Sequence, residues 1–191
     1  MNIKFLDIAA KKLKKLNFVN HGLHCWGRLC MFEGELGLHT PNLVSLFYIG
    51  TVVRLSESSD ILKLKNVSIR LQRYYDPRVL PSLDVGAMVS GLRRIENLSV
   101  SADFVLNFSP AFRRCGRNIT PFDHLRCLKL DLECKADHME GLIKLLQLSP
   151  NLEALRIQLV QLWMTSGWKS REVDVPCLSR NLKEIEIVAL P

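Results

Sequence analysis

Residues 125–130 read Leu-Arg-Cys-Leu-Lys-Leu, and residues 182–187 read Leu-Lys-Glu-Ile-Glu-Ile. Both fit the template L-x-x-L-x-L, whose last positions alternate between apolar and polar residues. Alternation with a period of two is typical of a short strand with one buried face. Seven copies occur when Ile, Val, Phe or Tyr is allowed in place of Leu, and their middle residues are Leu16, Leu46, Val67, Leu98, Leu128, Leu155 and Ile185.

Successive copies lie 21 to 31 residues apart, at the long end of the spacing of leucine-rich repeats or just past it. A single repeat cannot bury its apolar face, so neighbouring repeats must stack and share one core. The pattern predicts an α/β leucine-rich-repeat solenoid, a horseshoe arc. Its parallel sheet would form the concave face, and helices or irregular segments would form the convex face.

Two segments between the copies have helical features. Residues 137–148 place Met139, Leu142 and Leu146 close to helical spacing, and the Ser-Pro-Asn sequence at 149–151 ends that helix. Residues 82–92 form a second expected helix, with Ser82 as its N-cap.

Composition and charge exclude several classes of partner. The chain has 191 residues, 48% of them hydrophobic and 24% charged, which is the balance of a globular domain. Its net charge of +7 is concentrated in residues 11–15 and 113–117, but no aromatic residues are interleaved there, so we expect solvated faces and no nucleic acid. There is no apolar run of membrane-spanning length, and Lys4 and Asp7 interrupt any export signal. We therefore expect no membrane partner and a cytoplasmic or nuclear location.

The residues that usually carry chemistry do not form a recognisable site. The six cysteines contain no C-x-x-C pair, and the group His21, His24, Cys25 and Cys30 lacks a second ligand pair at a zinc spacing. There is no G-x-S-x-G, no H-E-x-x-H and no glycine-rich phosphate loop. We expect a non-enzyme with no catalytic residue, no metal and no cofactor.

Three segments carry a resemblance to a known family. Residues 41–46 read Pro-Asn-Leu-Val-Ser-Leu, residues 150–155 read Pro-Asn-Leu-Glu-Ala-Leu, and residues 176–187 read Pro-Cys-Leu-Ser-Arg-Asn-Leu-Lys-Glu-Ile-Glu-Ile. They resemble plant F-box proteins in which leucine-rich repeats precede an FBD domain. The resemblance implies repeats over residues 1–121 and, over residues 122–191, the last repeats with a partial FBD-like domain.

The same resemblance implies a function. It suggests the substrate-recognition half of an F-box (SCF-type) ubiquitin ligase receptor, which binds a protein substrate or partner. No F-box is present in the sequence, so we expect a Skp-type adaptor as a partner only if an F-box lies upstream. Two alternatives stay open: a stand-alone leucine-rich-repeat interaction protein, and a fragment of an extracellular leucine-rich-repeat receptor. The last is favoured by four glycosylation sequons, at Asn66, Asn97, Asn107 and Asn118.

The alternation also predicts which side chains face a partner. Residues that alternate with the buried ones project from the concave face, and Phe47 is the one large apolar side chain among them, so we take it as the anchor. A slip of one residue would bury Phe47 and expose Tyr48 instead. The predicted protein-binding residues are Phe47, Asn66, Ser68, Arg70, Asn97, Ser99, Lys129, Asp131, Arg156, Gln158, Glu184 and Glu186, and the same register adds Lys15, Asn17, Ser45, Cys127 and Ala154.

The two ends of the repeat array carry a further expectation. The strands at 16–19 and 182–188 have no capping segment, and terminal strands expose unpaired backbone and apolar side chains. We expect the isolated chain to be marginally stable or to self-associate.

Overall fold

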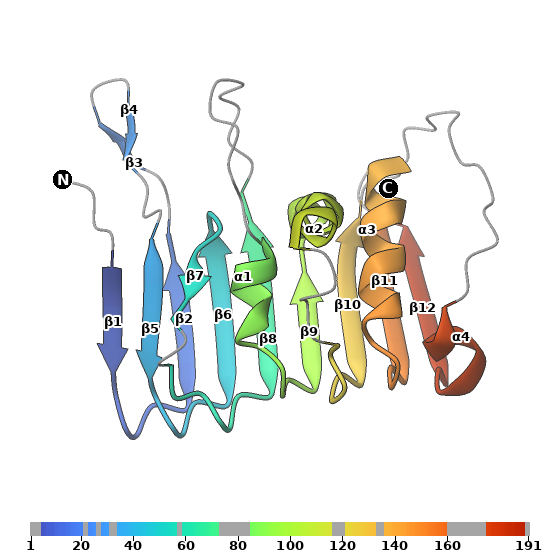
Figure 1. Cartoon of the computed structure of the whole chain (residues 1–191), viewed down its shortest axis with the longest axis horizontal. Coiled ribbons are helices and arrows are strands. Elements are labelled where there is room, and N and C mark those ends of the chain that lie inside the picture. The colour runs from blue at the N-terminus through green and yellow to red at the C-terminus, as the bar shows by residue number, and fades with distance from the viewer. Residues whose placement is uncertain are drawn as a thin grey trace.

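A long parallel sheet, which we call the main sheet, runs through the whole molecule (Figure 1). The structure is a computed structural model that describes residues 5–20, 23–25, 28–30, 34–56, 59–72, 85–115, 121–132, 136–159 and 175–189. The main sheet has seven strands in the order β12-β11-β10-β9-β8-β6-β2, so each strand pairs with the next one along the chain within this sheet. The strands are β2 (Lys15–Val19), β6 (Ser45–Gly50), β8 (Asn66–Leu71), β9 (Asn97–Val100), β10 (Cys127–Leu132), β11 (Ala154–Leu159) and β12 (Glu184–Ala189).

The register of the main sheet follows the sequence template. The middle residue of each copy pairs with the middle residue of the next, beginning with Leu16 opposite Leu46 and ending with Leu155 opposite Ile185. All seven copies therefore supply one strand each. This confirms the predicted α/β class and the parallel sheet of sequential strands. The sheet also crosses the boundary between residues 121 and 122, because β9 pairs with β10.

A repeated backbone bond fixes this register. The carbonyl of Lys14 accepts hydrogen bonds from the amides of Val44 and Ser45, at 2.9 and 3.1 Å. The same double acceptance recurs at one residue in each later coil: Val44, Lys65, Glu96, Arg126 and Glu153. Each coil therefore positions the next one before the strand begins.

The other face of the main sheet is covered differently in the two halves of the chain (Figure 1). Four helices of the described residues lie in the later coils: α1 (Val85–Ser90), α2 (Ala102–Cys115), α3 (Ala136–Gln147) and α4 (Pro176–Arg180). In the first coils, β1 (Phe5–Ala9), β5 (Glu35–His39) and β7 (Arg54–Leu55) form a second parallel sheet, the outer sheet. A short antiparallel hairpin joins β3 (Leu23–Cys25) to β4 (Arg28–Cys30).

The outer sheet corrects the expectation that only helices and irregular segments cover this face. Its strands reach β2, β6 and β8 through short turns, and alternate apolar residues such as Leu36 and Leu38 point into the core, so the segments pair as strands. The expected helix at 137–148 is confirmed as α3. The one expected at 82–92 is described only from Val85 to Ser90 as α1, since residues 82–84 lie outside the described part. Among the described helices, none combines the length and apolar character that crossing a bilayer requires.

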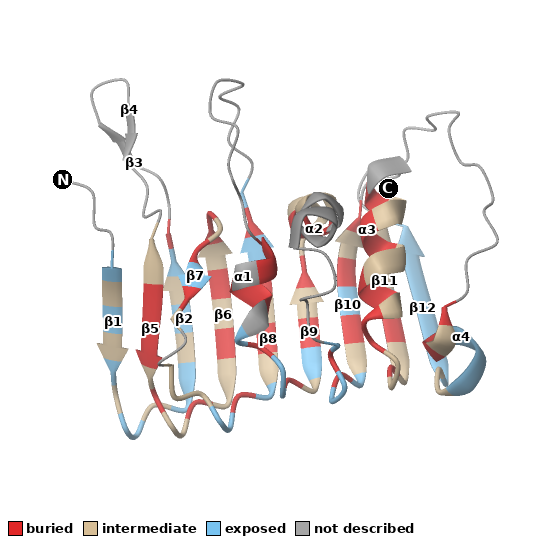
Figure 2. Cartoon of the chain, in the orientation of Figure 1, coloured by how far each residue is buried: buried red, intermediate tan, exposed pale blue. Residues whose placement is uncertain are grey.

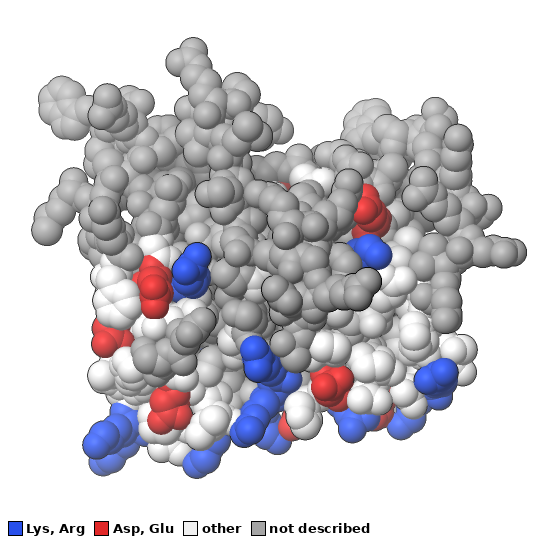
Figure 3. Space-filling model, in the orientation of Figure 1, with Lys and Arg blue, Asp and Glu red and all other residues white. Residues whose placement is uncertain are grey.

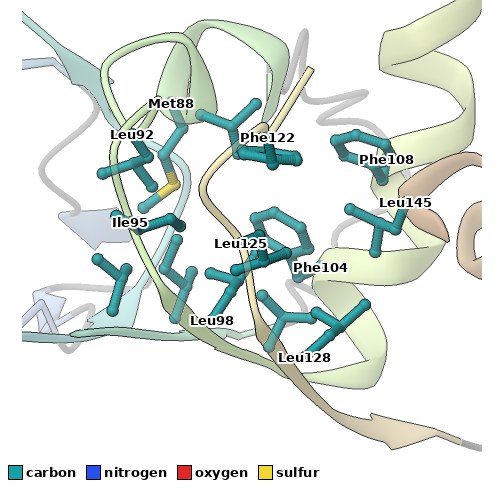
Figure 4. Close-up of a cluster of buried hydrophobic side chains, with 14 of the residues drawn as sticks. Met88, Leu92, Ile95, Leu98, Phe104, Phe108, Phe122, Leu125, Leu128 and Leu145 are labelled. Atoms are coloured by element: carbon teal, nitrogen blue, oxygen red, sulfur yellow. The ribbon is translucent and has the colours of Figure 1, made fainter. Parts of the chain in front are cut away.

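The core lies between the main sheet and the outer layer (Figure 2). In its centre, Phe104 and Phe108 of α2 stack on each other with ring centroids 5.9 Å apart, and Leu145 of α3 lies beside them (Figure 4). Burial falls off at the C-terminal end: Leu98 is 2% exposed, Leu155 4% and Ile185 57%, although the three occupy equivalent positions. The last strand thus contributes much less to the core than the middle strands do.

Candidate functional site

The main sheet has one face that neither the helices nor the outer sheet cover, which we call the open face. Its side chains alternate with the buried ones along each strand, as the burial of β6 and β8 shows. All the side chains predicted to face a partner lie on this face by register. Their role in binding stays a prediction.

A groove of about 460 Å³ lies on the N-terminal part of the open face. It crosses five neighbouring strands, β2, β6, β8, β9 and β10, and its lining is mostly amide, hydroxyl and aliphatic. The lining residues are Lys15, Asn17, Ser45, Leu46, Phe47, Asn66, Val67, Ser68, Asn97, Leu98, Ser99, Cys127 and Lys129. The groove therefore brings together Phe47, Asn66, Ser68, Asn97, Ser99 and Lys129 of the predicted residues.

Phe47 is the largest apolar side chain in this groove. It is half-buried, whereas its neighbour Tyr48 is 1% exposed and stacks on Phe18 with ring centroids 5.7 Å apart. The alternative register, with Phe47 buried and Tyr48 exposed, is therefore wrong. Phe47 lies between Asn17 of β2 and Ser68 of β8 in the same row of the sheet.

The polar groups of the groove are uncharged in its centre. Asn97 donates a hydrogen bond from Nδ2 to Oδ1 of Asn66 at 2.8 Å, which joins β9 to β8 on the open face. At the two ends of the groove lie Lys15 and Lys129, and within the described residues neither makes an ion pair. The groove thus offers amide and hydroxyl groups between two cations.

The open face outside the groove is charged but internally paired. Arg156 of β11 lies 3.3 Å from a carboxylate oxygen of Glu184 and 3.3 Å from one of Glu186, both on β12. Arg70 of β8 lies 3.8 Å from Asp131 of β10. Gln158 is half-buried on β11. These six predicted residues lie outside the groove, and five of them already satisfy one another's charge.

A second row of polar contacts joins the turns that precede the strands. Glu153 is bound by Lys183 and by Arg126, each at 2.8 Å. The hydrogen bond and the charge of Lys183, followed by the charge of Arg126, hold the pKa of Glu153 below its usual value. Lys and Arg side chains gather along this edge of the molecule, at the bottom of Figure 3. The row stabilises the stacking of coils and leaves the open face free.

Asparagine side chains support the same turns. Asn42, Asn151 and Asn181 each donate from Nδ2 to a backbone carbonyl of the preceding coil, at 2.8 to 2.9 Å. In the Pro-Asn pairs at 41–42 and 150–151, the asparagine therefore links its turn to the turn of the preceding coil. Each amide supplies a side-chain donor to a carbonyl in the turn of the preceding coil.

Cysteine, histidine and carboxylate side chains are the candidates for metal binding in the described part of the chain. Within them, no group of three or more His, Cys, Asp or Glu side chains is placed to hold a metal ion. Of the two cysteines whose side chains are described, Cys127 lines the groove, and burial raises the pKa of Cys177. His21 lies outside the described residues. For His24, Cys25 and Cys30 only the strands β3 and β4 are described.

A second cavity, of about 570 Å³, lies at the turns after β7 and α1, away from the open face. Leu62, which is 66% exposed, and Leu92 line it together with Arg93 and Arg94. The sequence did not predict this cavity, because it is formed by two irregular turns that no periodic pattern brings together.

No family model, no curated protein and no solved structure matches this chain. The resemblance to plant F-box proteins therefore depends on sequence segments such as residues 41–46, 150–155 and 176–187. The open face and its groove are the structural features that bear on function.

Proposed function

We propose that this chain is a leucine-rich-repeat arc that binds a segment of another protein along the open face and performs no chemistry. The groove across five strands, with one large apolar side chain among amides and hydroxyls, is the observation that carries this proposal. Affinity at protein interfaces is concentrated in a few anchors surrounded by polar contacts. Phe47 has that position here.

The chemistry of the groove suits an extended polypeptide. Such a segment presents a donor and an acceptor at every residue, and the rows of Asn and Ser side chains offer both. Neighbouring strands place these rows about 4.8 Å apart, and an extended peptide advances about 3.4 Å per residue, so a peptide lying across the strands meets a new row roughly every one and a half residues. Lys15 and Lys129 favour carboxylates at the two ends of the bound segment.

The family resemblance suggests the biological context. We infer the substrate-recognition half of an F-box (SCF-type) ubiquitin ligase receptor, in the cytoplasm or nucleus, with a Skp-type adaptor bound only through an upstream F-box. A stand-alone interaction module would use the same groove without the adaptor.

The extracellular receptor fragment is the weaker alternative. Asn66 and Asn97 are two of the four sequon asparagines, and both line the groove and bind each other. A glycan on either residue would fill the proposed binding surface. Asn107 donates its side-chain amide to the carbonyl of Asp103 in α2, and Asn118 lies outside the described residues.

A displayed peptide library tests the proposal. Peptides are selected on the wild-type chain, and their affinities are measured by fluorescence polarisation for three variants. Ser68→Arg places a long side chain in the middle of the groove and is expected to abolish binding. Phe47→Ala removes the anchor and is expected to weaken binding by at least about tenfold, which is roughly 1.4 kcal/mol.

Ser179→Arg is the matched control, because it makes the same chemical change at an exposed serine of α4. It is expected to bind as the wild type does. Circular dichroism confirms that each variant is folded. The proposal fails if the selected peptides bind Ser68→Arg and the wild type equally well.

A further inference from the structure

The last strand of the main sheet exposes side chains that its neighbours bury. Ile185 and Ile187 of β12 are 57% and 62% exposed, although their partners in β11, Leu155 and Ile157, are buried and half-buried. Val188 is 43% exposed. All six residues of β12 are exposed, and its outer edge pairs with no strand in the described part of the chain. Such an edge is a template for another strand.

Strand β2, at the other end of the main sheet, also has partly exposed apolar side chains and an open edge (Figure 1). Leu16 and Phe18 of β2 point into the core but stay half-buried, and Val19 is 46% exposed. Among the described strands, β6 alone pairs with β2, so its outer edge is also open. Lys15 begins the strand, and Lys11, Lys12 and Lys14 precede it.

All neighbouring strands of the main sheet pair in the same register. This register predicts which residues would be opposite each other if β12 of one copy paired with β2 of another. Every pair of neighbouring strands aligns equivalent positions, from Lys15 opposite Ser45 to Ala154 opposite Glu184. One more step of the same register sets Glu184 opposite Lys15 of the second copy. It also sets Ile185 opposite Leu16 and Ile187 opposite Phe18, with Val188 opposite Val19.

This alignment would pair opposite charges, bury apolar side chains and supply backbone hydrogen bonds at the same interface. Glu184, which pairs with Arg156 at 3.3 Å in the single chain, also comes to lie opposite Lys15. The three apolar pairs cover side chains that are exposed or half-exposed in the single chain. The carbonyl of Lys183 occupies the position that accepts two amides of the next coil throughout the sheet, here those of Lys14 and Lys15. One pair is unfavourable, Lys183 opposite Lys14, but Lys183 is already bound to Glu153 at 2.8 Å.

We propose that the occupant of the β12 edge is a second copy of this chain, joined head to tail through β2. The two surfaces are different and lie at opposite ends, so the contact is heterologous and each added copy leaves an end free for a further copy. The assembly leaves the centre of the groove accessible, and Lys15 at the end of the groove then faces Glu184 of the neighbouring copy.

Sedimentation equilibrium of the purified chain over a wide range of concentration tests the proposal. The expected result is an average mass that rises with concentration beyond two copies. Glu184→Lys sets two lysines opposite each other, and Lys15→Glu sets two glutamates opposite each other. Each variant alone is expected to associate at least about tenfold more weakly than the wild type.

Mixing the two variants gives the decisive result. The lysine introduced at position 184 then meets the glutamate introduced at position 15, and the unchanged Glu184 and Lys15 of the other ends also meet. An equimolar mixture is therefore expected to regain association, in alternating order. Failure of the mixture to associate, with both variants folded by circular dichroism, overturns the proposal.

Asp123→Lys is the control, since it makes the same change as Glu184→Lys at an exposed carboxylate before β10, in the interior of the array. It is expected to associate as the wild type does. An equal loss of association in this control, a mass that stops at two copies, or a chain that stays monomeric at all concentrations each overturns the head-to-tail contact.

Discussion

Tyr48 is a buried residue whose hydroxyl binds the backbone just after its strand. The hydroxyl donates a hydrogen bond to the carbonyl of Thr51, and Asn20 donates to Oγ1 of Thr51 at 3.1 Å. Burial raises the pKa of Tyr48 to about 12, although hydrogen bonds with Asn20 and Thr51 act in the opposite direction. The phenol therefore stays neutral in the folded chain at a pH where an exposed tyrosine is ionised.

Tyr48→Phe is expected to change the alkaline stability of the chain. Between pH 10 and about 12 the unfolded chain releases the Tyr48 proton while the folded chain keeps it, so the wild type loses stability as pH rises. At about 1.4 kcal/mol per pKa unit the loss approaches 3 kcal/mol. At pH 8 the variant is less stable by about 1 kcal/mol, because the Thr51 carbonyl loses its donor.

Urea unfolding at pH 8 and at pH 11.5 measures both effects. The variant is expected to be the less stable protein at pH 8, and its deficit is expected to close or reverse at pH 11.5. A deficit that stays constant between the two values would show that Tyr48 ionises at the same pH in the folded and unfolded chains.

The neighbouring pair Phe47 and Tyr48 shows how far sequence reasoning reaches at this scale. Alternation assigned Tyr48 to the core and Phe47 to the open face, and the structure agrees. Because Phe47 and Tyr48 are both aromatic and adjacent, the sequence also allows a register shifted by one residue. The observed pairing of Phe47 with Asn17 and Ser68 excludes that shifted register. The groove could not be predicted from the sequence of any single strand, because side chains of five neighbouring strands form it together.

At the scale of elements, helix α2 packs closely against α3 at Gly141. A Cβ built on Gly141 would lie 2.1 Å from the backbone oxygen of Val105 in α2, which is far inside the contact distance. A glycine in the middle of a helix usually costs stability relative to alanine. Here the close approach of two helices requires it.

Gly141→Ala is therefore expected to destabilise the chain by about 1–3 kcal/mol, despite the better helix propensity of alanine, because α2 and α3 must move apart. Gly91→Ala is the control, since its Cβ would meet Leu55 at 3.4 Å, an ordinary contact. Thermal unfolding followed by circular dichroism compares the two. Equal melting temperatures for both variants would contradict the packing argument.

The elements differ in how well the sequence predicts them. The seven strands and α3 follow from periodicity, because each has one apolar face in its own sequence. Helix α2 was not predicted: Pro110 lies within it, and proline usually argues against a helix interior. The outer sheet was also missed, because β1, β5 and β7 are short segments whose pairing depends on coils that are distant in sequence.

At the scale of the whole molecule, the chain is a one-dimensional stack. Each coil contacts its neighbours through the main sheet and through ladders such as Arg126–Glu153–Lys183. In such an array, stability is approximately a sum of coil and interface contributions. A coil in the middle has two interfaces and a coil at an end has one, so burial falls toward β12.

One alanine series across equivalent positions measures this gradient. Leu98→Ala in β9 is expected to cost about 2–5 kcal/mol, because a fully packed side chain is removed and a cavity remains. Leu155→Ala in β11 is expected to cost about the same. Ile185→Ala in β12 is expected to cost less than about 1 kcal/mol, because its side chain is 57% exposed. Urea unfolding at a concentration where the chain is monomeric provides the three values. An Ile185→Ala cost equal to that of Leu98→Ala would mean that the last strand is buried in solution, and the stack would then not end as an open edge at β12.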